Sequence, residues 1–445
     1  MKKLKQLSEA SFLKLLFAFV SVCFLIAAVC MPDRNQMFTG FWNILSSTCK
    51  ITTNYFSVGG YAATFLNMGV VGLMCLLLFV VFRGTPNNVS TLAVLLTIGF
   101  ASWGIHPLNI LPTMLGVVVY GLVKKEKLGT LVNAMIFSTG IAPIISDLLL
   151  RYPNTEAIGF NWPGLGIALG VGLVIGFFLP AGLAHSPKVH KGFDLYSAAL
   201  PIGMTAFLLN ATLYKTMGLD VNALKAAGDM SVTSAATVNI FCCVVFGLCI
   251  VIALLMGCKP KDYWKLLTDP ALVTNFSGTY GNATFLMNMG VYGLFILGYY
   301  NLIGASFNGV TFGLIFCMLA CCNSGSHPFN VWPIMLGYVV ASTVCGWIAP
   351  LVGGNFTLAV NAQAIVIGLC YANGLSPISD KYGWQYGFAA AMLHYLLVTS
   401  VPNLHGGFCL YNGGFTAALI CMMLVPELER FFKTKEEKRA LKVKQ

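Results

Sequence analysis

The amino-acid sequence predicts an all-α polytopic membrane protein built from two inverted-topology repeats, with broken or re-entrant helices. Three observations lead to this prediction. The 445 residues are 57% hydrophobic and only 9% charged, whereas a soluble domain carries about 25% charged residues. Several motifs occur twice in the same order. Lysine and arginine alternate between non-equivalent loops of the two repeats, as the positive-inside rule requires when one repeat is inverted.

The clearest duplication pairs SWGIHPLNILPTMLG, at 102–116, with NSGSHPFNVWPIMLG, at 323–337. His106 matches His327 at a separation of 221 residues, and seven of the eleven positions from the histidine onward are identical. Apolar composition alone does not account for a shared His, Asn and two Pro. Polar residues and prolines between apolar segments indicate a broken helix that lines a polar cavity.

Further pairs of motifs follow the same order. They are GGYAATFLNMGVVGL (59–73) with TYGNATFLMNMGVYGL (279–294), LVNA (131–134) with AVNA (359–362), GIAPIISD (140–147) with GLSPISD (374–380), and HKGFDLY (190–196) with HGGFCLY (405–411). The whole chain is therefore a duplication. We expect residues 1–225 to form the first transmembrane repeat and residues 226–445 the second, inverted one, with a basic cytoplasmic tail.

Hydropathy predicts about seven membrane segments in each repeat. In the first repeat they lie near 12–31, 66–82, 89–105, 108–123, 131–150, 163–185 and 194–214. In the second repeat they lie near 235–257, 287–303, 309–323, 329–347, 357–375, 386–401 and 408–425. Several are shorter than the ~20 residues of a simple span, which predicts half-helices or re-entrant segments. Asn54–Phe65 and Asn275–Phe285 are further re-entrant candidates.

The basic residues predict that both termini are cytoplasmic. Arg83, the run at 124–127 and the pair at 188–191 have counterpart loops without Lys or Arg, whereas the second repeat is basic at 259–265 and in its tail. The basic residues expected outside are Arg34, Lys50, Arg151, Lys215 and Lys225. The net charge of +11 thus sets topology, and we expect a lipid bilayer and no nucleic acid as partner.

The duplicated histidine motif predicts helix starts. Proline is favourable in the first turn of a helix because its missing N–H would be unpaired anyway. The histidines would then be caps, and the free N–H groups and dipole would attract anionic or carbonyl oxygens. We predict a substrate site at His106, Asn109, His327 and Asn330. Alternatively, each histidine only bonds its own helix end or a neighbouring helix.

Asp147 and Asp380 are carboxylates inside apolar segments of both repeats. An ionisable residue in a membrane segment is a candidate proton carrier or sodium ligand. Alternatively, Asp147 pairs with the nearby Arg151 and Asp380 with the adjoining Lys381, as interfacial ion pairs. The serine before each aspartate supplies a hydroxyl ligand, so the predicted ion-coupling residues are Ser146, Asp147, Ser379 and Asp380.

Two other repeated features are polar or aromatic. Asn67 and Asn288 begin NMG sequences that allow close approach of helices. They either bond across helices or contact substrate, and we include them among the substrate-binding candidates. Tyr196 and Tyr411 at helix starts are interpreted as anchors at the membrane interface.

Enzyme signatures such as HExxH, GxSxG and CxxCH are missing. We therefore expect no enzyme, no catalytic residue, no metal and no cofactor beyond a coupling sodium ion or proton. The missing P-loop excludes built-in ATP drive. The fifteen cysteines lack metal-ligand spacing and are interpreted as small buried apolar residues.

The HPxNxxPxMLG and ATFLNMG elements resemble those of an uncharacterised family of duplicated bacterial multi-pass membrane proteins, a domain of unknown function. This resemblance implies the bacterial plasma membrane and supplies no substrate. The segment 407–412 is similar to the Gly-x-x-x-Tyr-Asn helix start of urea transporters. However, Ser197 replaces that Asn in the first repeat and the Leu-Pro-x-x-Thr-x-Pro-Phe element is missing, so urea is not inferred as substrate.

These features together predict a secondary transporter that moves a small polar or anionic solute by alternating access, coupled to an ion gradient. The first alternative is a passive facilitator or channel, which the scarcity of intramembrane charge favours. A metal-dependent intramembrane enzyme and a scaffold without solute flux are further alternatives. A homo-oligomer is compatible with the sequence, which identifies neither the substrate nor the coupling ion.

Overall fold

The computed structural model describes residues 7–152, 158–269, 272 and 274–443, and these residues contain helices and no strand. The helices of the first repeat are α2 (Glu9–Cys30), α3 (Met37–Leu45), α4 (Tyr55–Val58), α5 (Gly60–Val81), α6 (Asn88–Phe100), α7 (Pro107–Lys124), α8 (Val132–Phe137), α9 (Pro143–Leu150), α10 (Trp162–Val189) and α11 (Ala199–Leu213). A 3-10 turn, η3 (Ser138–Ile141), links α8 to α9.

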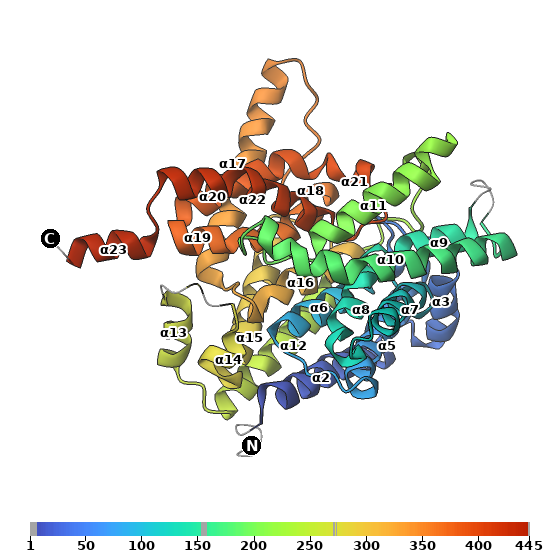
Figure 1. Ribbon diagram of the computed structural model, residues 1–445, viewed down its shortest axis with the longest axis horizontal. Helices are drawn as coiled ribbons and strands as arrows, with labels where there is room; N and C mark the ends of the chain where they lie inside the picture. Colours follow the sequence, from blue (N-terminus) through green and yellow to red (C-terminus); the bar gives the residue numbers. More distant parts are fainter. Residues whose placement is uncertain (1–6, 153–157, 270–271, 273, 444–445) are drawn as a thin grey trace.

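The second repeat has the same order. Its helices are α12 (Ala235–Leu255), α13 (Pro260–Thr268), α14 (Phe276–Tyr280), α15 (Asn282–Leu302), α16 (Gly309–Leu319), α17 (Pro328–Leu351), α18 (Gln363–Ala372), α19 (Ser376–Tyr382), α20 (Trp384–Val398), α21 (Val401–Leu404), α22 (Asn412–Phe431) and α23 (Lys435–Val443). The turns η6 (Ala320–Asn323) and η7 (Asn373–Leu375) follow α16 and α18. In Figure 1, the C-terminal helix α23 projects from the helical body.

Seven helices of the described chain are long and apolar enough to cross a membrane, namely α2, α5, α7, α10, α12, α15 and α17. The pair formed by α8–η3 and α9 is bent by 55° and makes an eighth candidate span. Large apolar side chains such as Val81, Phe178, Ile240 and Trp347 are exposed on these helices, as expected of surfaces that face lipid. The predicted segments are helical, and the expectation that several are too short to span is confirmed.

The predicted re-entrant stretches contain the short helices α4 and α14. The side chain of Asn54 caps the start of α4 by accepting a hydrogen bond from the Phe56 N–H, 3.2 Å away. Asn275 caps α14 through the Gly278 N–H at 2.9 Å. Each short helix is followed directly by a long apolar one, α5 or α15. The two repeats therefore share this local geometry.

The centre of the molecule is formed by α6 and α16, one from each repeat. Both helices are apolar, too short to cross a membrane, and almost completely buried. They approach closely at glycine: a Cβ atom on Gly99 would lie 2.6 Å from the Cys317 Sγ atom and 2.6 Å from the Gly313 carbonyl oxygen. The two repeats therefore pack together as one body, not as separate domains.

The repeats also interlock through reciprocal contacts. The Leu195 N–H of the first repeat donates to the Gly374 carbonyl at 3.0 Å, and the Leu410 N–H of the second donates to the Gly140 carbonyl at 2.9 Å. Each glycine lies in the turn before α9 or α19. Tyr196 and Tyr411, which follow the two leucines, are fully buried. The prediction that they anchor the membrane interface is therefore wrong.

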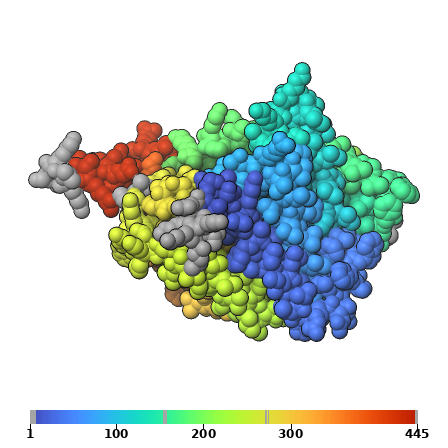
Figure 2. Space-filling view, turned by 90° about the horizontal axis from the view of Figure 1, so that it is seen from below, coloured from blue at the N-terminus to red at the C-terminus, as the bar shows by residue number. Residues whose placement is uncertain are grey.

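The N-terminal helix α2 lies against α12 of the second repeat. Figure 2 shows the blue N-terminal segment beside yellow-green segments of the second repeat. The rings of Phe24 and Phe241 lie 4.7 Å apart between centroids. The first helix of the second repeat thus contacts the first helix of the chain.

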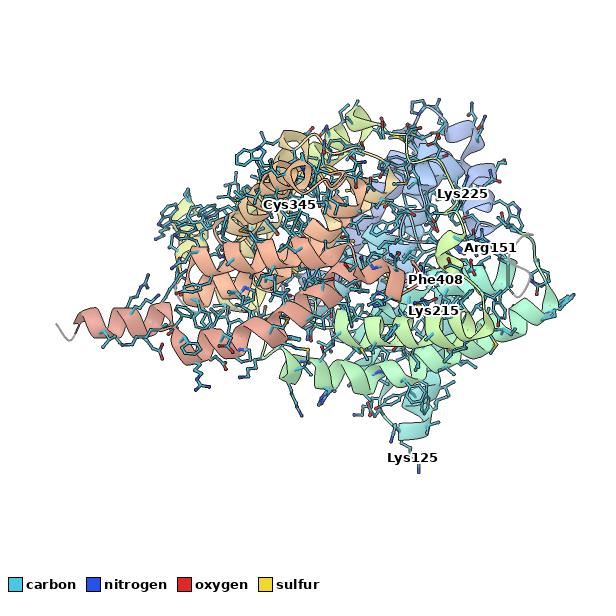
Figure 3. The ribbon with its side chains drawn as sticks, turned by 90° about the horizontal axis from the view of Figure 1, so that it is seen from above. Lys125, Arg151, Lys215, Lys225, Cys345 and Phe408 are labelled. Atoms are coloured by element: carbon cyan, nitrogen blue, oxygen red, sulfur yellow. The ribbon has the colours of Figure 1, made fainter. Side chains whose placement is uncertain are left out.

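Figure 3 shows where four of the basic residues on which the predicted topology depends lie in the molecule. Arg151, Lys215 and Lys225, all predicted to lie outside, gather at one end of the molecule in Figure 3. Lys125, predicted to lie inside, is placed apart from them in the same view. Lys191, also predicted to lie inside, forms an ion pair with Glu429 near the C-terminal tail.

The reciprocal contacts predict that Gly140 tolerates no side chain. A Cβ atom there would lie 2.0 Å from the ring of Tyr411, and overpacking of this kind costs about 1–3 kcal/mol. We expect Gly140→Ala to lower the thermal unfolding temperature of the purified protein. Gly170→Ala in α10, where a Cβ atom meets nothing within 4 Å, is the control. Equal unfolding temperatures for the two variants would contradict this account of the packing.

Candidate functional site

The helix α7 begins at the predicted His-Pro motif. His106 is the N-cap in an extended conformation, and Pro107 occupies the first turn. The Asn109 Oδ1 atom accepts a hydrogen bond from the His106 N–H at 2.9 Å, and the His106 Nδ1 atom accepts one from the Asn109 N–H at 3.4 Å. These bonds form a capping box, which satisfies backbone donors that a helix start leaves free.

The helix α17 begins in the same way. His327 is the N-cap, Pro328 follows it, and the Asn330 Oδ1 atom accepts from the His327 N–H at 2.9 Å. The Asn330 Nδ2 group donates to the Gly325 carbonyl at 2.8 Å, as that of Asn109 does to Gly104 at 3.2 Å. Both predicted helix starts are therefore present with a histidine at the N-cap position, but only the His106 ring accepts a capping hydrogen bond.

The bent segment α8–η3–α9 places Ser146 against the start of α7. The Ser146 Oγ atom lies 3.1 Å from the His106 Nε2 atom and accepts from the Asn109 Nδ2 group at 3.0 Å. Since the His106 Nδ1 atom accepts a backbone N–H, we assign the ring proton to Nε2, which donates to Ser146. All three residues are buried. The first repeat thus brings three of the predicted site residues together.

In the second repeat an aspartate occupies the place of this serine. The Asn330 Nδ2 group donates to the Asp380 Oδ2 atom at 2.6 Å. Ser146 and Asp380 each lie three residues after a proline, Pro143 or Pro377. The contacts therefore match Ser146 with Asp380, which corrects the match of Asp147 with Asp380 and of Ser146 with Ser379.

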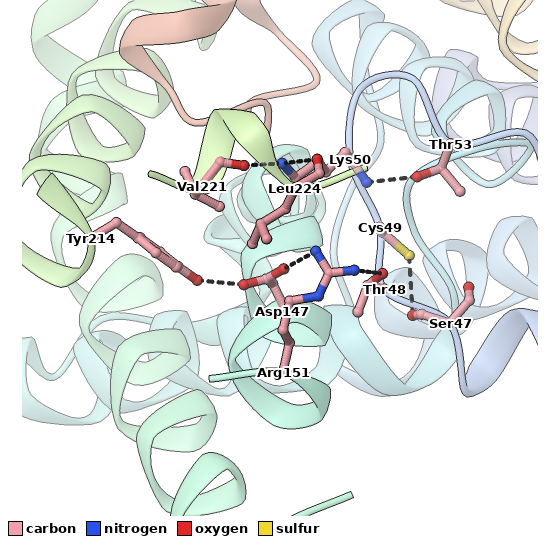
Figure 4. A network of polar contacts seen from close by, with 10 residues as sticks. All are labelled: Ser47, Thr48, Cys49, Lys50, Thr53, Asp147, Arg151, Tyr214, Val221 and Leu224. Atoms are coloured by element: carbon pink, nitrogen blue, oxygen red, sulfur yellow. Dashed lines mark hydrogen bonds and ion pairs between the residues drawn. The ribbon is translucent and has the colours of Figure 1, made fainter. Parts of the chain in front are cut away.

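Asp147 points to a different set of partners, shown in Figure 4. Its Oδ2 atom accepts a hydrogen bond from the Tyr214 hydroxyl at 2.7 Å. Its Oδ1 atom lies 3.7 Å from the Arg151 Nη1 atom. The alternative interpretation of Asp147 as an ion pair with Arg151 agrees with this geometry. Both side chains are buried within the protein, since Asp147 and Arg151 are 0% and 6% exposed.

Two buried cations adjoin this carboxylate. The Arg151 Nη2 group donates to the Thr48 hydroxyl at 3.2 Å, while its Nε and Nη1 groups have no hydrogen-bond acceptor within the described chain. The Lys50 ammonium donates to the carbonyls of Val221 and Leu224 (Figure 4). Burial is the main cause that lowers the pKa of Lys50 to about 8, against the opposing effect of Asp147. The cluster therefore holds two buried cationic groups and one buried carboxylate.

In the second repeat, the predicted ion-coupling residues Ser379 and Asp380 also face different partners. Ser379 packs against Gly387 of α20, where a Cβ atom would lie 1.8 Å from the Ser379 Oγ atom, whereas Asp380 faces Asn330. Lys381 does not pair with Asp380 in the described chain. Its ammonium lies 4.9 Å from the centroid of the Phe193 ring. Neither repeat brings its predicted serine and aspartate together as one ion site.

Asn67 and Asn288 bond to backbone at the break between two helices. The Asn67 Nδ2 group donates to the carbonyls of Ala101 and Ile105, at 2.6 and 2.8 Å. Asn288 makes the equivalent bonds to Cys322 and Ser326, at 2.8 and 3.0 Å. This geometry supports the interpretation that they bond across helices, because their donors are occupied by the protein itself.

The two histidine clusters do not meet. In Figure 1, α7 lies at the right of the molecule and α17 at the upper left, and no hydrogen bond joins the clusters within the described residues. The residues predicted to form a single substrate site therefore lie in two separate clusters. We call the cluster at the start of α7 the first half-site and the cluster at the start of α17 the second half-site. His327 differs from His106, because its Nδ1 atom is buried without a hydrogen-bond partner among the described residues.

In the sequence, Lys50 is marked only as an outward basic residue and Arg151 as an outward basic residue and a partner of Asp147, whereas nothing points to Tyr214 or Thr48. None of these four residues belongs to a duplicated motif. Lys50 contacts Val221, which lies 171 residues later in the chain, and no local sequence pattern predicts such a contact. No group of three or more His, Cys, Asp or Glu in the described part of the chain could hold a metal ion.

The fold and the buried polar clusters define a multi-span helical membrane protein with a duplicated domain. A family model described as protein of unknown function (DUF1576) matches residues 33–215 and again residues 259–430. The chain belongs to this family, and the predicted resemblance is confirmed. No curated protein and no solved structure matches the chain, so the likeness to urea transporters stays a resemblance of sequence.

The bonds of Asn67 predict a structural role. Replacing it by Leu leaves two buried carbonyls without their donor, and an unsatisfied buried polar group costs about 1–3 kcal/mol. We expect Asn67→Leu and Asn288→Leu each to lower the thermal unfolding temperature, with Asn43→Leu on the exposed face of α3 as control. Unchanged stability in both variants would return these residues to the list of substrate contacts.

Proposed function

We propose that the protein is a secondary transporter that moves a small polar or anionic solute across the bacterial plasma membrane by alternating access. The observation that carries the proposal is the buried pair of cations, Lys50 and Arg151, with Asp147 as the one buried carboxylate beside them. An unpaired buried charge is costly. A bound anion would supply the missing negative charge.

The start of α7 adjoins these cations. Cys49, which precedes Lys50, lies beside Ser146, and Ser146 bonds to both His106 and Asn109. A helix start favours negative charge through its N–H groups and its dipole. The first half-site therefore offers an anion a guanidinium, an ammonium and a hydroxyl within one buried region, near the positive end of the α7 dipole.

The second half-site suits ion coupling. Asp380 accepts one hydrogen bond, from Asn330, and pairs with neither Lys381 nor an arginine within the described residues. Asp147, in contrast, is already engaged by Arg151. We propose Asp380 as the first group to test for proton or sodium coupling. A passive facilitator is the second candidate, because the paired state of Asp147 leaves few free intramembrane charges.

The anion half-site predicts a loss of binding on removal of the guanidinium. A hydrogen bond to a charged group contributes about 1.5–3 kcal/mol, so Arg151→Gln should weaken binding of a stabilising anion about 10- to 100-fold. The measurement is thermal shift of the full-length protein in detergent against acetate, lactate, succinate, phosphate and sulfate. Lys215→Gln, an exposed basic residue at the same end, is the control.

Lysine 50 adds a pH dependence to this experiment. Because burial lowers the pKa of Lys50 to about 8, the ammonium loses its charge as the pH rises through this value. Anion binding should therefore be strongest below pH 8 and weaken above it. Binding that is equal in Arg151→Gln and independent of pH from 6 to 9 would refute the anion half-site.

The transport proposal itself is tested by uptake. We expect His106→Ala and His327→Ala to abolish uptake into proteoliposomes while leaving membrane expression intact, with the exposed His185→Ala as control. The solute is the stabilising anion of the thermal-shift screen, measured with and without imposed sodium and proton gradients. Dependence on one gradient supports secondary transport, and equal uptake without any gradient supports the facilitator. Normal uptake by the double histidine variant would exclude the site.

A further inference from the structure

A cavity of about 520 Å³ lies away from both histidine clusters. It is enclosed by the start of α6, by α8, by the end of α10 and by the link between α10 and α11, and Thr274 and Ser324 of the second repeat complete its wall. Its apolar lining includes Leu92, Phe137 and Leu183. The volume falls within the ~300–1,000 Å³ that is typical of small-molecule sites.

Two acceptor oxygens on residues that line this cavity have no hydrogen-bond partner among the described residues. Asp194 is 2% exposed, and its Oδ1 atom accepts a hydrogen bond from the Tyr196 N–H at 2.9 Å. Its Oδ2 atom has no hydrogen-bond partner among the described residues. Asn133, which also lines the cavity, has a buried Oδ1 atom that likewise lacks a partner. Two acceptor oxygens are therefore left for a ligand.

No lysine or arginine of the described chain lines the cavity, and its one histidine is already satisfied. The His190 Nδ1 atom accepts the Asp194 N–H at 3.3 Å, and its Nε2 atom lies 2.9 Å from the Ser197 hydroxyl oxygen. Burial lowers the pKa of His190 to about 4, so the ring is neutral. No positively charged side chain of the cavity lining therefore pairs with the Asp194 carboxylate.

We propose that this cavity binds a small organic cation of the primary ammonium class, with Asp194 as its counter-ion and Asn133 as a second acceptor. The N–H groups of an ammonium match oxygens that only accept, and its carbon chain matches the apolar wall. A bare metal ion fits less well, because magnesium and calcium take about six or more oxygen ligands. The site shares no residue with the anion half-site and stands without it.

Protonation of Asp194 is linked to this site. Burial raises the pKa of Asp194 to about 8, against the lowering effect of the hydrogen bond from the Tyr196 N–H. The other titratable groups that face it are His190, Cys321 and Cys421. Without a ligand, the carboxyl group is therefore protonated below about pH 8, and binding of an ammonium displaces the proton.

The experiment measures binding of n-butylammonium chloride to the full-length protein in detergent by isothermal titration at pH 8.5. We expect saturable binding to the wild type, at least tenfold weaker binding to Asp194→Asn, and several-fold weaker binding to Asn133→Leu. The exposed Glu126→Gln is the matched carboxylate control and should bind as the wild type does. Neutral n-butanol tests whether the charge is required, and sodium chloride tests an inorganic cation.

A second measurement needs no ligand. The folded pKa of Asp194 lies above the ordinary carboxyl value of 3.8, so the buried carboxyl costs stability progressively as the pH rises from about 4 to about 8. The unfolding temperature of Asp194→Asn relative to the wild type should therefore be higher at pH 9 than at pH 5. Equal butylammonium binding in wild type and Asp194→Asn, or stabilisation by sodium chloride alone, would overturn the proposal. If Asp194→Asn does not fold, wild-type affinity in Asn133→Leu overturns it as well.

Discussion

The structure depends on one constraint: a helix that breaks inside the membrane exposes backbone N–H and C=O groups that lipid cannot satisfy. Both repeats meet this constraint with asparagine. Asn67 and Asn288 bond the carbonyls that end one half of the break. Asn109 and Asn330 bond the N–H groups that begin the other half. The NMG and HPxN motifs are therefore two parts of one device, which explains why they are duplicated together.

The charged groups are not duplicated, although the scaffold is. Lys50, Arg151 and Asp147 gather in the first repeat, where the ungapped register places Lys381 opposite Asp147. Asp194 likewise has Cys409 as its counterpart. An isolated charge in a buried site is costly, so each of these departures from symmetry requires a compensating group. The proposed ligands of the two sites are those compensating groups.

The sequence predicted the repeats and the helix starts because proline and capping residues act locally. It misplaced the match after Pro143 because aligning the shared Ser-Asp pair required a gap of one residue. One residue turns a helix by about 100°, so the gap assigned Asp147 and Ser379 to the wrong face. Hydropathy marked α6 and α16 as membrane segments because they are as apolar as helices that face lipid, although they are too short to cross a membrane. Asp194 carries no signal of this kind, because the corresponding residue of the second repeat is Cys409.

The interlocking of the repeats has a consequence for biosynthesis. Gly140 receives its contacts from Leu410 and Tyr411, whereas Tyr196 packs on Gly374. The first repeat leaves the ribosome before either partner exists, so its bent segment enters the membrane without the side chain that later covers it. The asparagine contacts at the break between α6 and α7 lie within the first repeat, so they can form in this interval. Native packing around Gly140 is therefore completed only after Leu410 and Tyr411 have been synthesised.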